Sequence, residues 1–119
     1  MIYYPLSTLI LAGVTEVSIS SSDAGLNQLQ KLLGDGTQWG IKIDYLEQKE
    51  ALGIADAVRL HVTASKEASS YLILLGDNFF YGQSFGRYLS ELSLNDEAVC
   101  WTQTVRDPAN FGKIGRAHV

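Results

Sequence analysis

Short β-rich runs alternate with helix-period runs along most of this chain, and the alternation restricts its fold more than any other feature. Residues 15–20, 40–47, 71–75 and 98–105 carry alternating or continuous apolar side chains that predict strands. Residues 54–64 and 85–92 show apolar residues at helical spacing, as do two segments before residue 34. Strands joined through helices form right-handed crossovers and a parallel sheet covered on both faces. The sequence therefore predicts an α/β fold with a mostly parallel sheet.

Glycines and small polar residues mark where the predicted helices begin and end. The first helix, with Pro5 in its first turn, is expected to end at Gly13. A Ser-Ser-Asp sequence can cap the second helix, which is expected to stop at Gly34-Asp35-Gly36. This stop follows a helix and lacks the Lys and Ser/Thr of a phosphate-binding loop, so we interpret it as a turn.

Charge and cysteine content exclude several kinds of partner. The net charge is -4 and the nine basic residues are scattered singly, so neither nucleic acid nor a membrane surface is expected as a partner. Cys100 is the only cysteine, which excludes an internal disulfide and fits a reduced, cytoplasmic location. The apolar start is too short to cross a bilayer and has no basic leader, so we identify no targeting signal. The length of 119 residues is that of one ordinary domain.

Asp77 is the first candidate for chemistry. It follows the apolar run 71–75 by one residue, at the end of a predicted buried strand, which is where ligands bind in parallel sheets. A carboxylate in this position suits a hard divalent cation. The alternative, that Asp77 only caps the following turn, stays open on these residues alone.

Gln48 and Gly53 are candidates for recognising a base. Gln48 ends the predicted strand 40–47, and Gly53 opens the next helix after a four-residue turn. A neutral amide donates and accepts at once, as the edge of a pyrimidine does, and glycine lets the backbone approach a ring. Both could equally be ordinary loop residues.

Other catalytic arrangements are not favoured by the sequence. The two histidines, His61 and His118, have no cysteine or carboxylate partner at metal-ligand spacing, and we interpret both as structural or incidental. No Ser-His-Asp or Cys-His arrangement indicates a nucleophilic enzyme.

Five segments in order and spacing give the chain a specific resemblance: MIYYPLSTLILAGVTEV, LLGDGTQWGIKIDYLEQ, LGIADAV, LLGDNFFYG and VRDPANFG. Together they resemble the sugar-1-phosphate nucleotidyltransferases, and among these the glucose-1-phosphate thymidylyltransferases, up to Gly112. The resemblance implies a Rossmann-like three-layer sandwich of the nucleotide-diphospho-sugar transferase type. It also implies joining of dTTP to glucose 1-phosphate, with release of pyrophosphate.

The resemblance assigns roles to four positions. It implies that Gln48 and the backbone of Gly53 bind the base, that Asp77 binds Mg²⁺, and that Gly112 lies beside the sugar. Asp107 and the proline after it resemble the start of the family's Asp-Pro-x-x-Tyr-Gly stretch. A uridylyltransferase or another hexose-1-phosphate nucleotidyltransferase remains an alternative, as does a non-catalytic nucleotide-binding module. A homo-oligomeric whole protein is also left open.

The sequence departs from the family pattern at three places. Ala51 and Leu52 stand in the base loop where the family has Pro and then an acidic or small residue. The family's opening strand, its Gly-Gly-x-Gly-Thr-Arg-Leu loop and the following Lys do not occur. We therefore expect a fold without its first strand and C-terminal part, and a chain without catalytic residues or turnover.

Residues 1–113 are expected to be a partial nucleotidyltransferase domain. Residues 114–119, Ile-Gly-Arg-Ala-His-Val, match a translated sequencing adapter, and we hypothesise a non-native tail.

Overall fold

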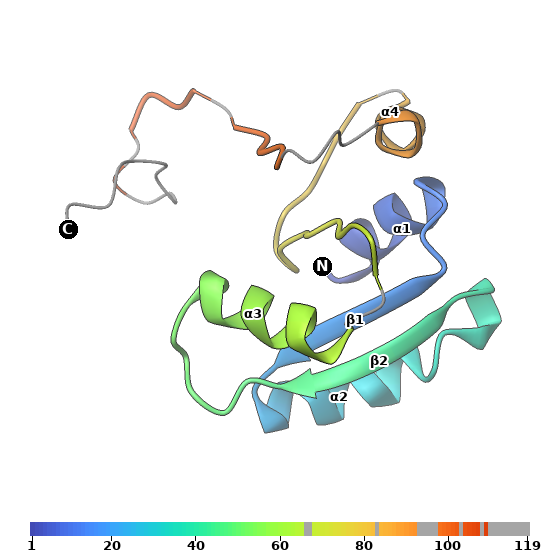
Figure 1. Cartoon of the computed structure of the whole chain (residues 1–119), viewed down its shortest axis with the longest axis vertical. Helices are drawn as coiled ribbons and strands as arrows, with labels where there is room; N and C mark the ends of the chain where they lie inside the picture. The colour runs from blue at the N-terminus through green and yellow to red at the C-terminus, as the bar shows by residue number, and fades with distance from the viewer. Residues whose placement is uncertain (66–67, 83, 93–97, 103, 108, 110–119) are drawn as a thin grey trace.

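Two parallel strands, joined through a helix, form the centre of the molecule (Figure 1). The computed structural model describes residues 1–65, 68–82, 84–92, 98–102, 104–107 and 109. In chain order its elements are α1 (Tyr3–Leu11), β1 (Glu16–Ser21), α2 (Asp23–Leu33), the 3-10 helix η1 (Thr37–Trp39), β2 (Lys42–Glu47), α3 (Ile54–Ala64) and α4 (Phe85–Glu91). The predicted helices are confirmed, and their predicted ends lie within two residues of the observed ones. The short helix η1 was not indicated by the sequence pattern.

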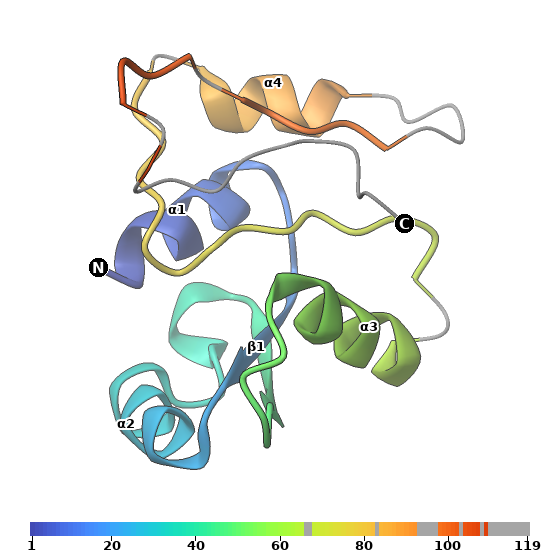
Figure 2. The ribbon, with the colours of Figure 1, turned by 90° about the vertical axis from the view of Figure 1, so that its left-hand side faces the viewer.

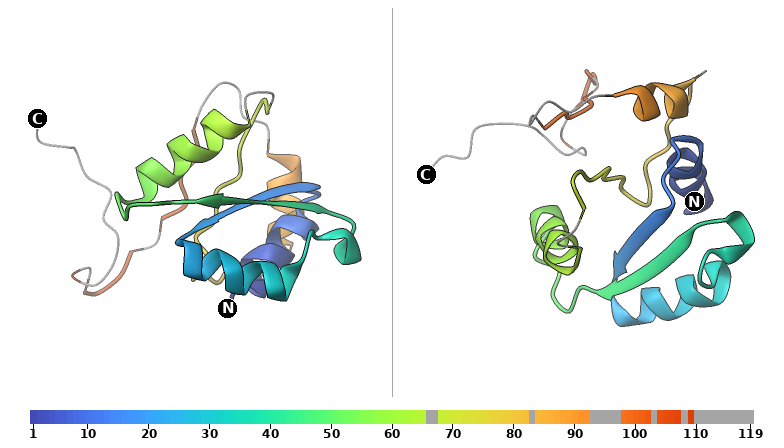
Figure 3. Two further views of the ribbon diagram at one scale, coloured as in Figure 1. Left: turned by 90° about the horizontal axis from the view of Figure 1, so that it is seen from below. Right: turned by 45° about the vertical axis from the view of Figure 1, so that its right-hand side comes forward.

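The parallel pairing confirms the predicted α/β class. β1 and β2 pair in register from Glu16 opposite Lys42 to Ser21 opposite Glu47, and α2 forms the crossover between them. Helices α1 and α2 cover one face of the two strands and α3 covers the other (Figure 3). The three layers expected from the alternation are therefore present around this strand pair.

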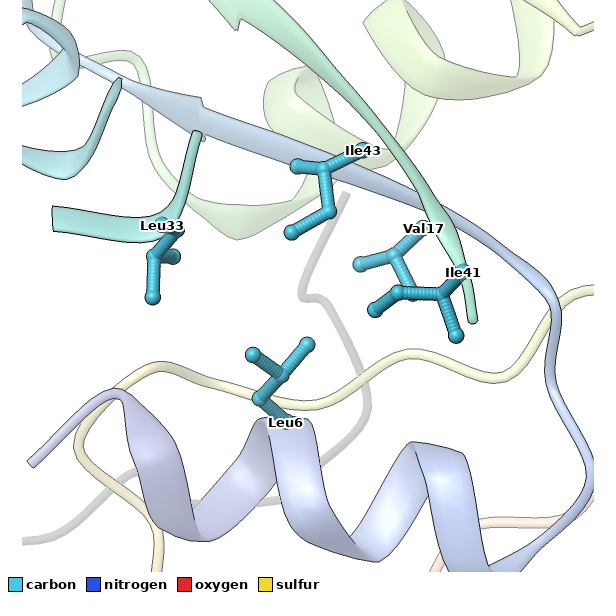
Figure 4. Close-up of a cluster of buried hydrophobic side chains, with 5 residues drawn as sticks. All are labelled: Leu6, Val17, Leu33, Ile41 and Ile43. Atoms are coloured by element: carbon cyan, nitrogen blue, oxygen red, sulfur yellow. The ribbon is translucent and has the colours of Figure 1, made fainter. Parts of the chain in front are cut away.

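The core lies between α1, α2 and the two strands (Figure 4). It is formed by five buried aliphatic side chains that point towards one another: Leu6, Val17, Leu33, Ile41 and Ile43. Leu33, the last residue of α2, is 0% exposed. On β2 the buried Ile43 alternates with exposed Lys42 and Asp44, as the predicted polar and apolar faces of this strand require. The core therefore belongs to the β1–α2–β2 unit and to α1, which closes it.

The turn that follows α2 depends on one glycine. Gly36 has a φ of +87°, in the left-handed region that L side chains avoid. A Cβ on Gly36 would lie 2.7 Å from Ile43 Cγ1 and 2.9 Å from the Ile41 carbonyl oxygen. Here the side chain of Asp35 accepts hydrogen bonds from the Thr37 N–H, at 3.1 Å, and hydroxyl, at 2.7 Å. These bonds lower the pKa of Asp35, and the segment is a turn, as predicted.

Two predicted strands are wrong. Residues 71–75 are extended but join no ladder, and the described residues within 98–105 form no strand either. The sheet has two strands in the part of the chain that the structure describes. Ile73 is 53% exposed and Val99 is 44% exposed, although both lie in apolar runs that typify buried strands.

The physical reason is the absence of a neighbouring backbone within pairing distance. Every residue of β1 and every residue from Ser70 to Gly76 lines a cavity of about 760 Å³ that lies between these two segments. Paired strands lie about 4.8 Å apart, so an intervening cavity prevents the ladder that would convert the apolar run into a strand. A high β-propensity means that the side chains of a segment suit a pleated sheet. It does not supply the neighbouring strand with which the segment must pair.

The extended segment nevertheless runs in the direction expected of a third parallel strand. The Tyr71 hydroxyl donates to the Ser65 carbonyl oxygen just beyond α3, and Gly76 lies beside Ile2 at the start of α1. Figure 2 shows the segment passing from the end of α3 towards the N-terminal end of α1. Both helices run antiparallel to β1, so the order of these contacts aligns residues 71–76 with β1. Among the helices of the described residues, none is long and apolar enough to cross a membrane.

Candidate functional site

The loop between β2 and α3 holds two of the predicted site residues. Gln48 follows β2, and its N–H donates to the Ser21 carbonyl oxygen at 2.9 Å. This bond continues the β1–β2 ladder by one residue, so the backbone of Gln48 is fixed by the sheet. Gly53 is the residue before α3, as the sequence predicted.

Gly53 has a conformation that requires glycine. Its φ is +92° and its ψ is −178°, a region in which an L side chain is strained. A Cβ built at Gly53 would meet no atom within 4 Å, so the space beside its backbone is open. Both properties allow another molecule to approach the peptide groups at the start of α3.

The structure brings Gln48 and Gly53 into direct contact. Gln48 Nε2 donates to the Gly53 carbonyl oxygen at 3.2 Å and to Asp56 Oδ2 at 3.3 Å. The predicted pair therefore forms a closed loop braced by a side chain. The predicted role of this pair in binding a base stays a prediction.

Asp56 and Arg59 belong to the same network, and sequence reasoning missed both. Arg59 Nη2 lies 2.8 Å from Asp56 Oδ1, one turn further along α3. The hydrogen bond from Arg59, followed by that from Gln48, holds the pKa of Asp56 below its ordinary value against the opposing effect of desolvation. An acidic residue in the first turn of a helix with a basic residue three positions later is the signal that could have identified them.

Two hollows meet at Gln48. It lines the cavity between β1 and residues 70–76, together with Gly53 and Gly76. It also lines a second hollow of about 400 Å³, together with Asp56, Arg59 and three charged residues next to it in sequence: Glu47, Lys49 and Glu50. Gln48 therefore borders both hollows.

Asp77 lies in the turn that follows the extended segment. The turn is closed by a hydrogen bond of 3.1 Å from the Asn78 N–H to the Leu75 carbonyl oxygen, and Asp77 is exposed. Its neighbour Gly76 lines the same cavity as Gln48 and Gly53, whereas Asp77 itself is not among the residues that line it. Within the described ranges, no group of three or more His, Cys, Asp or Glu side chains could hold a metal ion.

Gly112, the remaining predicted site residue, lies outside the described residues. Asp107, at the start of the same stretch, accepts a hydrogen bond of 3.1 Å from the Ala109 N–H and so closes a local turn.

His61 makes a specific contact with β1. Its Nδ1 lies 2.9 Å from Ser18 Oγ across the space between α3 and β1. Partial burial lowers the pKa of His61 below its ordinary value. The neutral ring that burial favours can donate to or accept from Ser18, so this contact helps to hold α3 on the sheet.

Comparison with known proteins gives a consistent result. A family model described as nucleotidyl transferase matches residues 1–118. Proteins named glucose-1-phosphate thymidylyltransferase are 37% identical in Neisseria gonorrhoeae, 36% in Xanthomonas campestris pv. campestris and 32% in Mycolicibacterium smegmatis. These matches cover 96%, 94% and 96% of this chain but only 40%, 38% and 39% of the relatives. The resemblance inferred from the five sequence segments is confirmed, and the chain belongs to the nucleotidyl transferase family.

Proposed function

We propose that this chain is the base-binding part of a glucose-1-phosphate thymidylyltransferase. The whole protein would join dTTP to glucose 1-phosphate in the cytoplasm and release pyrophosphate. Relatives of this name support the proposal, although the chain spans only about two fifths of their length. The structural observation that carries it is the contact between the Gln48 carboxamide and the Gly53 backbone beside open space.

Gln48 and Gly53 have the groups that a pyrimidine imide requires. Thymine presents an N–H flanked by carbonyl oxygens, so it needs an acceptor beside a donor. With Nε2 turned towards Gly53 and Asp56, the Oε1 atom of Gln48 is the acceptor, and the Gly53 N–H is a donor. Uracil presents the same edge, so uridine nucleotides are expected to bind in the same way.

Asp77 is compatible with a magnesium ion although it is a single carboxylate. Mg²⁺ is commonly held by one or two carboxylates, with substrate phosphates and waters completing its shell. An exposed carboxylate in the turn beside Gly76 fits this requirement. When bound, the ion would neutralise phosphate charge during direct phosphoryl transfer. Gln48 and Gly53 would hold the base and so orient the triphosphate.

Base recognition can be tested by isothermal titration of the chain with dTTP, UTP and ATP. We expect Gln48→Ala to reduce the preference for dTTP over ATP roughly ten- to a hundredfold, because a buried hydrogen-bonded pair is worth about 1–3 kcal/mol. Gln38→Ala is the matched control, since Gln38 Nε2 donates to the Leu33 carbonyl oxygen at 2.8 Å in another loop. A preference that stays within a factor of two in Gln48→Ala would contradict the proposal.

Magnesium binding can be tested in the same titration with and without Mg²⁺. We expect Asp77→Asn to remove most of the gain in dTTP affinity that Mg²⁺ produces, while Gln48→Ala keeps that gain. If Mg²⁺ increases the dTTP affinity of Asp77→Asn as much as that of the wild type, Asp77 only caps the turn. We further expect no pyrophosphate release from dTTP and glucose 1-phosphate by this chain. Release above a protein-free control would refute that expectation.

A further inference from the structure

Asp56 is positioned to control which way the Gln48 side chain faces. Its two carboxylate oxygens serve two different donors, Gln48 Nε2 on Oδ2 and Arg59 Nη2 on Oδ1. The Asp56 side chain is 19% exposed, whereas that of Arg59 is 71% exposed. The Asp56 carboxylate is therefore largely shielded from solvent, whereas the Arg59 side chain is exposed.

The surroundings of Gln48 allow one orientation of its carboxamide. The Gly53 carbonyl oxygen and the Asp56 carboxylate are both acceptors, and both lie within 3.3 Å of Nε2. Turning the amide over would place Oε1 against these two oxygens and would break both hydrogen bonds. Hydrogen bonding from Arg59 lowers the pKa of Asp56, so the carboxylate remains an acceptor at neutral pH.

We propose that Asp56 is a specificity-determining positioning residue that fixes Gln48 with its acceptor oxygen towards the ligand. The inference rests on the proposed role of Gln48 in binding the base. It adds that the choice of base depends on a residue that does not touch the base.

A fixed acceptor selects among bases by the atom at one ring position. Thymine and uracil present an N–H there, which donates to Gln48 Oε1. Cytosine presents an unprotonated nitrogen at the same position, and this would face Oε1 as a second acceptor. Because both bases are single-ring pyrimidines, comparing dTTP with dCTP avoids the steric exclusion that would affect a purine. Two facing acceptors leave both atoms desolvated and unpaired.

The decisive variant is Asp56→Asn in the full chain. Asparagine has one acceptor oxygen for two donors, so Gln48 and Arg59 compete for it and the carboxamide of Gln48 is free to turn. We expect the ratio of dTTP to dCTP affinity, measured by titration calorimetry, to fall about tenfold. Asp56→Glu, which keeps a carboxylate, should retain most of the wild-type ratio of dTTP to dCTP affinity. Asp44→Asn is the matched control, because Asp44 pairs with Lys42 at 2.8 Å on the exposed face of β2.

A ligand-free measurement tests the orientation itself. In a two-dimensional ¹⁵N–¹H spectrum of the chain, the side-chain amide resonances of Gln48 should move in Asp56→Asn towards those of the exposed Gln28. They should stay in place in Asp44→Asn. A Gln48 resonance that does not respond to Asp56→Asn would overturn the inference.

The outcomes separate the inference from the function on which it rests. If the chain binds dTTP and Asp56→Asn keeps the wild-type ratio of dTTP to dCTP affinity, the inference is wrong and the proposed function stands. If the chain binds neither nucleotide, the proposed function is refuted and the inference falls with it. A tenfold loss of selectivity with rescue by Asp56→Glu supports both.

Discussion

The β1–α2–β2 unit with α1 and the described residues between 68 and 109 contain similar apolar runs but differ in how they bury them. In the first, Leu33 and Ile43 are 0% and 5% exposed. In the second, Leu89 is buried, whereas Ile73 is 53% exposed and Tyr81 is 93% exposed. The difference shows that an apolar run forms a core only where neighbouring elements cover it on the required sides.

The two regions also differ in how far apart their partners lie in sequence. β1 and β2 are connected by the 11-residue helix α2, which packs on the strands that it joins. This local crossover places the two strands side by side, as is usual for strand–helix–strand units. The extended residues 71–75 have no such local partner among the described residues, and a cavity separates them from β1.

The strongest test of the comparison is Leu33→Ala. Because Leu33 is fully buried in the shared core of α1, α2 and the strands, its truncation should lower the free energy of unfolding by about 2–5 kcal/mol. Leu32→Ala, next to it and 51% exposed, should cost well under half of that. Urea denaturation followed by circular dichroism measures both. Equal losses in the two variants would show that the core is not where the structure places it.

The second test concerns the turn after α2. Gly36→Ala should cost about 2–4 kcal/mol, because the left-handed backbone is strained and the added Cβ meets Ile43 and the Ile41 carbonyl. Gly40→Ala should cost only the backbone strain of about 1–2 kcal/mol, since nothing lies within 4 Å of its Cβ position. Their difference in denaturation midpoint measures the steric part. The absence of any difference would contradict the close packing of this turn on β2.

A third test compares the close packing at Gly86, between α4 and α1, with the close packing at Gly36. A Cβ on Gly86 of α4 would lie 2.7 Å from Leu11 Cβ on α1. We expect Gly86→Ala to loosen α4 from α1 while changing the global free energy of unfolding by less than about 1 kcal/mol, because alanine also favours the helix. Hydrogen exchange at Leu89 should accelerate, and Gly82→Ala, which meets no atom within 4 Å, should leave it unchanged. A global loss as large as that of Gly36→Ala would mean that both regions unfold as one.

The smallest expected effect is the pH dependence produced by His61. Burial lowers the pKa of His61 in the folded chain below the ordinary 6.5 that the unfolded chain retains. The unfolded state therefore binds more protons as the pH falls through 6.5, and stability declines in that direction. The contribution is fully present above about pH 7. Denaturation at pH 7.5 and 5.5 should show a smaller decline in His61→Leu than in the wild type. An equal decline would assign the effect to other groups.

Sequence patterns identified the local features of the candidate site and missed its network. Gln48 and Gly53 were predicted from their positions after a strand and before a helix, and the structure places them in contact. Asp56 and Arg59 were missed because an acidic and a basic residue on one helix face are ordinary surface features. Only the folded path of the loop between β2 and α3 shows that Asp56 also accepts a hydrogen bond from Gln48.

The sequence by itself determined the helices, their ends, the β1–α2–β2 crossover and the family of the chain. Helical hydrogen bonds join residues four positions apart, and a side-chain cap such as that of Ser22 to Gly25 acts within one turn, so local composition is sufficient. The tertiary structure decided which apolar runs became strands, because a strand needs a partner that its own residues do not encode. Residues 71–75 have strand composition but face a cavity where β1 would have to be. The orientation of Gln48 was decided in the same way, since it depends on acceptors that only folding brings within 3.3 Å.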